Sequence, residues 1–142
     1  MEKIRISKDF VFEAAHALDN HDGKCKNIHG HSYKLTVTVE GTPKNDIEAS
    51  DSGMVIDFTV LKNIVNTQII KPYDHALVLK DNSRFKGIEK QNDKTIYTPY
   101  HPTCENMLLD FKDKIASQLP NSIELVYMKL NETATSYAEW MK

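Results

Sequence analysis

The chain has 142 residues, a formal net charge of −2 at pH 7, 40% hydrophobic residues and 27% charged residues. This composition and length are typical of a globular protein, and they predict a single domain over residues 1–142. The balanced charge argues against a nucleic-acid partner, and no apolar run reaches the roughly 18–20 residues that a membrane span needs. The first residues are rich in charge and lack the apolar core of a secretory signal, so we expect a cytoplasmic protein.

The amino-terminal third alternates between apolar and polar residues, which is typical of β-strands. One strand is predicted over about residues 3–16 and a second from residue 29 to Gly41, where Gly41-Thr42-Pro43 ends it. The polar stretch 17–28 between them contains Asn-His-Asp-Gly and is predicted to be a loop.

The middle of the chain has two segments with apolar residues at helical spacing. Asp57 is expected to cap the first helix, which Pro72 should stop, and Pro102-Thr103 is expected to open the second helix. Between them, residues 76–79 are either a short buried strand or an extended segment, and residues 80–98 are predicted to be an exposed excursion.

Two further strands are predicted near the end of the chain, over residues 123–130 and 136–140. The order ββααββ indicates an α+β fold in which a four-stranded antiparallel sheet carries two helices on one face. Because such a sheet has two edges to protect, we expect a homo-oligomer that closes them between subunits.

Histidine is the most unusual feature of the sequence, because four of the six histidines lie between His16 and His31. His29 and His31 flank Gly30 on a predicted strand, so both imidazoles point the same way. If the first two strands pair as a hairpin, His16 lies beside them. Three neutral imidazoles with an open fourth position are typical of catalytic zinc, and we predict a Zn²⁺ site with these ligands.

Cys25 lies in the predicted loop, four residues before His29 and between Lys24 and Lys26. It is either a fourth ligand of a structural metal site, an ordinary loop cysteine, or a thiolate base whose pKa the nearby cations lower. The sequence does not decide between a ligand and a base. The other cysteine, Cys104, begins a predicted helix and is interpreted as structural.

Two further acidic positions are candidates for the site. Asp74 precedes His75 in a predicted loop, where the pair is either a proton relay or an ordinary surface pair. Glu132 follows a strand with apolar residues on both faces, and its carboxylate either binds a ligand or is a solvated turn residue.

Several motifs in this order resemble the 6-pyruvoyl-tetrahydropterin synthase superfamily, and within it the bacterial branch that makes 6-carboxytetrahydropterin for queuosine. The three-residue gap between Cys25 and His29 is similar to that of the bacterial branch. The motifs are Phe12-Glu13-Ala14-Ala15-His16, Cys25-x-x-x-His29-Gly30-His31, Ile56-Asp57-Phe58, Asp74-His75, Pro102-Thr103-x-Glu105-Asn106 and Glu132-Thr133.

The resemblance implies the tunnelling fold, in which trimers close a barrel and two trimers stack into a hexamer, with active sites between subunits. It implies zinc on the three histidines, Cys25 as the proton-abstracting residue, and His75 as a second acid/base supported by Asp74. It further implies that Glu132 anchors the pterin ring, and that Thr103 and Glu105 contact the substrate.

The reaction that the resemblance implies converts 7,8-dihydroneopterin triphosphate to 6-carboxy-5,6,7,8-tetrahydropterin, with release of acetaldehyde and triphosphate. A lyase that forms the pyruvoyl product is the nearest alternative. A non-catalytic module, whose hairpin is held together by a structural His3Cys zinc site, is an alternative of a different class. The segment 80–98 is longer and more charged than the bacterial pattern.

Overall fold

A long hairpin organises the fold of the computed structural model, which describes residues 1–142. Strand β1 (Ile4–His16) pairs antiparallel with β2 (His29–Gly41) along its whole length. Side chains alternate as the sequence predicts, with Phe12 and Leu35 buried on the face that carries the core. The register places His16 opposite His29, which confirms the predicted hairpin.

The sheet has six strands, in the order β4-β3-β1-β2-β5-β6. The four expected strands are β1, β2, β5 (Glu124–Asn131) and β6 (Tyr137–Met141), and they pair antiparallel with one another. Two strands, β3 (Ala76–Lys80) and β4 (Thr95–Thr98), add a parallel pair beside β1. The expected number of strands was therefore too low, because β3 shows no alternation and β4 is too short to show a period.

The first helical region begins after Asp57, whose side chain accepts a hydrogen bond from the Thr59 N–H at 2.8 Å. It comprises α1 (Phe58–Val65), a π-helical stretch (Asn66–Ile70) and α2 (Lys71–Tyr73). The helical run ends at Tyr73, one residue after Pro72, so the predicted stop is placed to within one residue. The second predicted helix is α3 (Cys104–Ala116). None of these helices combines the length and the apolar character that crossing a bilayer requires.

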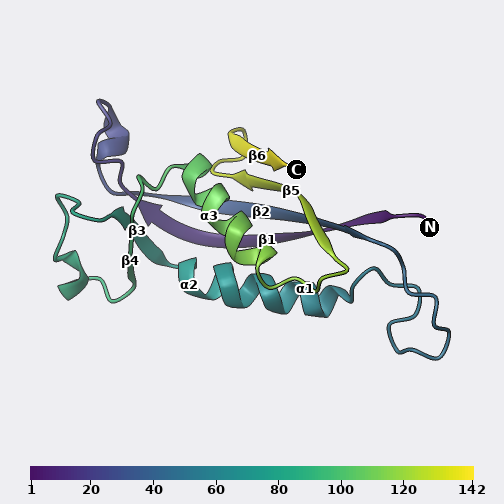
Figure 1. Cartoon of the computed structure of the whole chain (residues 1–142). Helices are drawn as coiled ribbons and strands as arrows, with labels where there is room; N and C mark the ends of the chain where they lie inside the picture. Colours follow the sequence, from purple (N-terminus) through teal and green to yellow (C-terminus); the bar gives the residue numbers. More distant parts are fainter.

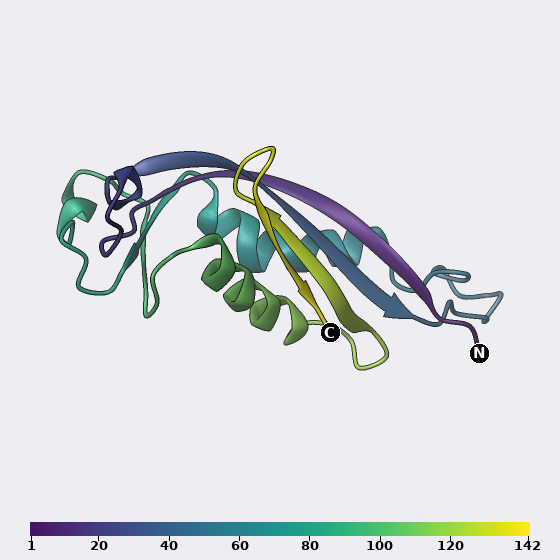
Figure 2. The same ribbon diagram turned by 90° about the horizontal axis from the view of Figure 1, so that it is seen from above.

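The main core lies between the helices and one face of the curved sheet, and Figure 2 shows β1 and β2 arching over the helices (see also Figure 1). It contains 22 buried residues, including Tyr33 from β2, Leu61 from α1 and Phe111 from α3. The layered α+β arrangement is the one expected from the sequence, and it leaves the other face of the long hairpin free of helices (Figure 2).

A second, smaller core lies on that other face, at the end of the sheet formed by β3 and β4. Leu77 and Leu79 alternate along β3 with Val78, which belongs to the main core, so they point to the opposite side. Phe85 and Ile88 pack against them. The segment 80–98 is therefore not simply an exposed excursion, since it contains β4 and covers part of the sheet.

Candidate active site

Three histidines meet at the end of the long hairpin. His16 and His29 are directly opposite in the register of β1 and β2, and His31 follows two residues later on the same face. One ligand nitrogen from each of the three lies within 4.8 Å of the other two, and no cysteine or carboxylate belongs to this group. The predicted convergence is present in the fold, and the group could hold a metal ion.

Backbone carbonyls fix the orientation of two of these rings. His16 Nδ1 donates to the carbonyl of Pro102 at 2.7 Å, and His29 Nδ1 donates to the carbonyl of Asn27 at 2.8 Å. A carbonyl can only accept, so in each neutral ring the proton is on Nδ1 and the Nε2 lone pair is free. The two Nε2 atoms face each other at 2.9 Å, an unfavourable contact unless a cation is shared between them.

The electrostatics of the histidine group also favour the binding of a cation. Burial lowers the pKa of His16 to about 4, so this ring is neutral at pH 7. Burial lowers the pKa of His31 as well, although the nearby Glu132 carboxylate opposes the shift. His31 Nε2 is buried without a hydrogen-bond partner, which is the expected state of a ligand atom whose partner is a metal.

Glu132 lies at the start of the turn that follows β5, with Oε1 3.5 Å from His31 Nε2. It lines a cavity of about 350 Å³, large enough for part of a small ligand. The other lining residues are Cys104, Glu105, Ser136, Tyr137 and Ala138. Thr103 lies outside this lining, and its hydroxyl caps α3 by accepting from the Asn106 N–H at 3.1 Å. The structure thus brings Glu132 and Glu105 to one cavity beside the histidines.

The two cysteines have different environments. Cys25 is half-buried in a 3₁₀ turn, Lys24–Lys26, which we call the Cys25 turn. Its carbonyl accepts from the Leu18 N–H at 2.9 Å, which closes the loop between β1 and β2. Cys104 is buried, donates to the carbonyl of Leu130 at 3.2 Å, and has a thiol pKa that burial raises to about 11.

Asp74 and His75 lie between α2 and β3. The two side chains contact each other, with 3.1 Å between Asp74 Oδ2 and His75 Nδ1. Asp74 Oδ1 accepts from the Glu13 N–H at 2.9 Å, and this bond is the main reason that the pKa of Asp74 is lowered. His75 has a φ of 64°, in the left-handed region that non-glycine residues rarely adopt, and such strain is often found at functional sites.

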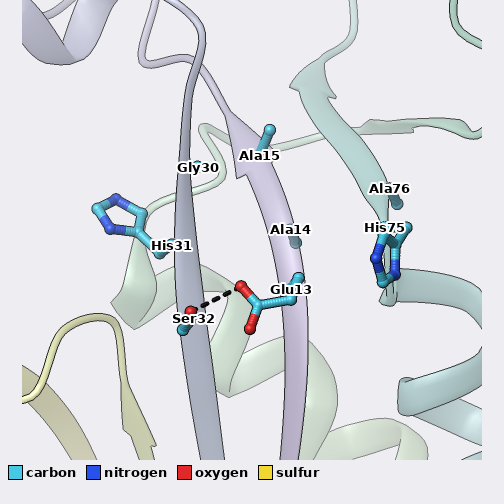
Figure 3. Close-up of a pocket in the computed structure, with 8 residues that line it drawn as sticks. All are labelled: Glu13, Ala14, Ala15, Gly30, His31, Ser32, His75 and Ala76. Atoms are coloured by element: carbon cyan, nitrogen blue, oxygen red, sulfur yellow. Dashed lines mark hydrogen bonds between the residues drawn. The ribbon is translucent and has the colours of Figure 1, made fainter.

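The side chain of His75 is 77% exposed and lies away from the three histidines. Figure 3 shows β1 and β2 between His31 on one side and His75 on the other. A cavity of about 290 Å³ lies here, and Glu13 and Ser32, which line it, are joined by a hydrogen bond of 2.7 Å. His31 and His75 also line this cavity, whereas His16 and His29 do not.

Other residues around the histidine group were missed by the sequence analysis. Tyr33 packs beneath His16 and His31, with ring centroids 6.3 Å and 5.6 Å away. The sequence could have indicated Tyr33, because it lies two residues after His31 and therefore on the same face of the second strand. Pro102 contributes through its carbonyl, and Arg84 contacts the Cys25 turn from the segment 80–98. No pattern in the sequence indicates these two contacts.

The sequence profile of the family described as "6-pyruvoyl tetrahydropterin synthase" matches residues 5–142. The chain therefore belongs to this family, which agrees with its fold and with its group of three histidines.

Two named proteins have sequences similar to that of this chain. A 6-carboxy-5,6,7,8-tetrahydropterin synthase from Haemophilus influenzae is 37% identical, and the match covers 98% of this chain and 99% of the relative. A Rickettsia typhi protein of the same name is 30% identical over 96% of this chain and 99% of the relative. The chain is thus an enzyme of the lyase type that these relatives represent.

Solved structures share the fold. An uncharacterized protein from Wolinella succinogenes matches with a TM-score of 0.82 at 17% identity, covering 100% of this chain and 99% of that one. The 6-pyruvoyl tetrahydropterin synthase of Caenorhabditis elegans matches with a TM-score of 0.71 at 24% identity, covering 100% of this chain and 97% of that one. The tunnelling fold predicted from the sequence is therefore confirmed.

Proposed function

We propose that this chain is a zinc-dependent lyase of queuosine biosynthesis. It converts 7,8-dihydroneopterin triphosphate to 6-carboxy-5,6,7,8-tetrahydropterin, releasing acetaldehyde and triphosphate. The names of the full-length relatives support the reaction. The observation that carries the chemistry is the group of three imidazoles beside a cavity that holds a carboxylate.

His16, His29 and His31 are the proposed zinc ligands. The neutral ring of His16, the hydrogen bonds that His16 and His29 donate from Nδ1, and the unpartnered Nε2 of His31 support this assignment. Zinc in such a site supplies a Lewis acid that polarises substrate oxygens and stabilises negative charge that develops on them.

The substrate is positioned and deprotonated by other residues in this proposal. Glu132 accepts hydrogen bonds from the amino-pyrimidine edge of the pterin, with Glu105 at the same cavity and Thr103 at the start of α3 as further contacts. The Cys25 thiolate takes a proton from substrate carbon at Sγ. The absence of Cys25 from the group of candidate ligands supports a role as base rather than as fourth ligand.

His75 acts as the second acid/base, exchanging a proton at Nε2 while Asp74 holds Nδ1. His31 and His75 line one cavity, but Figure 3 shows the His31 ring on the side of β2 that faces away from His75, and we propose that His75 of a second copy of the chain completes the site. This separation, together with the open sheet edges at β4 and β6, supports a homo-oligomer with sites between subunits, a hexamer of two trimers.

Product analysis tests the proposed reaction. The purified protein, loaded with zinc, is incubated with 7,8-dihydroneopterin triphosphate, and the products are identified by mass spectrometry. We expect 6-carboxytetrahydropterin with an equal amount of acetaldehyde. The description of the family makes the pyruvoyl-forming activity the alternative, and triphosphate release without acetaldehyde would establish it instead. No turnover, together with unfolding on zinc removal, would favour the non-catalytic module.

A further inference from the structure

The connection between β3 and β4, residues 81–94, contacts both segments that carry the proposed acid/base residues. It is fixed to the sheet by Phe85 and Ile88, which pack on Leu77 and Leu79. Because these apolar contacts hold the connection in place, polar side chains that extend from it can restrain neighbouring segments.

Arg84 reaches from this connection to the Cys25 turn. Its Nη2 donates to the carbonyl of Lys26 at 2.8 Å and to Oδ1 of Asn27 at 3.2 Å. Its Nε lies 3.7 Å from Oδ1 of Asp19, a buried oxygen that has no hydrogen-bond partner. The guanidinium also lies 4.5 Å from the centre of the Phe85 ring. Arg84 therefore contacts both sides of the loop that holds Cys25.

Asn27 links Arg84 to the histidine group. The carbonyl of Asn27, whose side chain Arg84 holds, accepts from His29 Nδ1 at 2.8 Å. Arginine suits this position because its planar group presents several donors in fixed directions, which a lysine cannot reproduce.

Lys94 makes the corresponding contact at the other end of the connection. Its Nζ donates to the carbonyl of Lys71 at 2.7 Å and also to the carbonyl of Asp74. Lys71 begins α2, which is the last turn of the helical run, and Asp74 belongs to the turn that carries His75. A cation at the carboxyl end of a helix is favourable, and here it holds the turn in which His75 adopts its left-handed conformation.

We propose that residues 81–94 are a positioning element, in which Arg84 fixes the Cys25 turn and Lys94 fixes the Asp74–His75 turn. The proposal rests on the proposed function, since it assigns a purpose to holding these two turns. Neither residue touches substrate in this proposal, so both are positioning residues. Because proton transfer depends steeply on distance, a small displacement of a turn costs rate rather than binding.

The test compares Arg84→Ala and Lys94→Ala with Lys86→Ala, which removes an exposed cation from the same connection. Amide hydrogen exchange is measured by mass spectrometry over residues 18–28 and 71–76. We expect exchange over 18–28 to accelerate about tenfold in Arg84→Ala alone, and exchange over 71–76 to do so in Lys94→Ala alone. Thermal unfolding midpoints are measured for all variants, so that local loosening is distinguished from global destabilisation.

Kinetics supply the second measurement. In both variants kcat is expected to fall about tenfold while KM stays within about twofold of the wild-type value. Arg84→Lys keeps the charge but lacks the planar guanidinium group, so it should recover only part of the lost kcat. It also serves as the second variant if Arg84→Ala does not fold.

Unchanged exchange in both segments, or acceleration spread over the whole chain, would overturn the proposal. So would kinetics equal to those of Lys86→Ala. A wild-type protein that makes no product contradicts the proposed function instead, and the exchange pattern then decides by itself whether the connection holds the two turns.

Discussion

His31 Nε2 and Glu132 Oε1 lie 3.5 Å apart, which joins the end of the long hairpin to the turn after β5. The contact places a carboxylate beside the candidate metal group, although Glu132 does not belong to that group. Two roles are open to such a residue, since it can support a metal ligand or bind substrate in the adjoining cavity. These roles lead to different results when the carboxylate is replaced.

Glu132→Gln is expected to keep the metal and lose activity. The amide retains the shape of the side chain but not the charge, and a lost charge-assisted hydrogen bond of about 2–3 kcal/mol lowers kcat/KM by roughly 30- to 160-fold. Metal content is measured by elemental analysis beside steady-state kinetics. Glu105→Gln, at an exposed carboxylate on the same cavity, is the matched control with a smaller expected effect. Loss of metal in Glu132→Gln would mean that the carboxylate supports the metal instead.

His29→Ala is expected to abolish tight metal binding, because two imidazoles remain where three converge. The control is His21→Ala, which removes a histidine of the loop before β2 that instead accepts from the Gly23 N–H at 2.8 Å. After dialysis, the wild type and His21→Ala should retain about one zinc per chain, and His29→Ala less than about a tenth of that. Equal zinc in the two variants contradicts the assignment.

The metal-free protein should lose stability as the pH falls below the ordinary pKa of histidine. In the folded chain the pKa of His16 is lowered from 6.5 to about 4, so between these values the unfolded chain binds more protons than the folded chain. The stabilisation is present above pH 6.5 and is lost progressively toward pH 4. From pH 7 to pH 5, His16 alone lowers the free energy of unfolding by about 2 kcal/mol.

Urea unfolding with a chelator present measures this effect at the two pH values. His16→Gln, which does not titrate, is the comparison, and its free energy of unfolding should change less between pH 7 and pH 5. An identical pH dependence in the wild type and in His16→Gln would show that this imidazole is not the group responsible.

Cys25→Ala should keep zinc and lose turnover, because the thiol is proposed as a base and not as a ligand. Cys104→Ala is the matched control at the other cysteine, whose buried thiol has a pKa of about 11 and donates to a backbone carbonyl. Because Cys104 lines the cavity proposed for the substrate, Cys104→Ala is expected to change KM without abolishing turnover, to keep its zinc and to lose about 1–2 kcal/mol of stability. If zinc and folding are lost together in Cys25→Ala, the cysteine is a ligand and the proposed base is wrong.

Much of the fold follows from local patterns. Alternation along β1 and β2 predicted both strands and their pairing, and Asp57 and Thr103 were found at the starts of α1 and α3, where their side chains cap the helices. The parallel pair β3 and β4 was missed in part, because a fully buried strand and a four-residue strand carry no period of two. The end of the helical run at Tyr73 lies one residue after the predicted stop at Pro72.

The sequence by itself determined the histidine group, because residues two apart on one strand and a partner in hairpin register must converge. Only the tertiary structure decided where each remaining candidate lies. It placed Glu132 beside His31, it placed His75 at a cavity that His31 also lines, and it brought Arg84 to the Cys25 turn. These relationships join segments far apart in the chain, and the packing of the strands and connections, rather than local spacing, creates them.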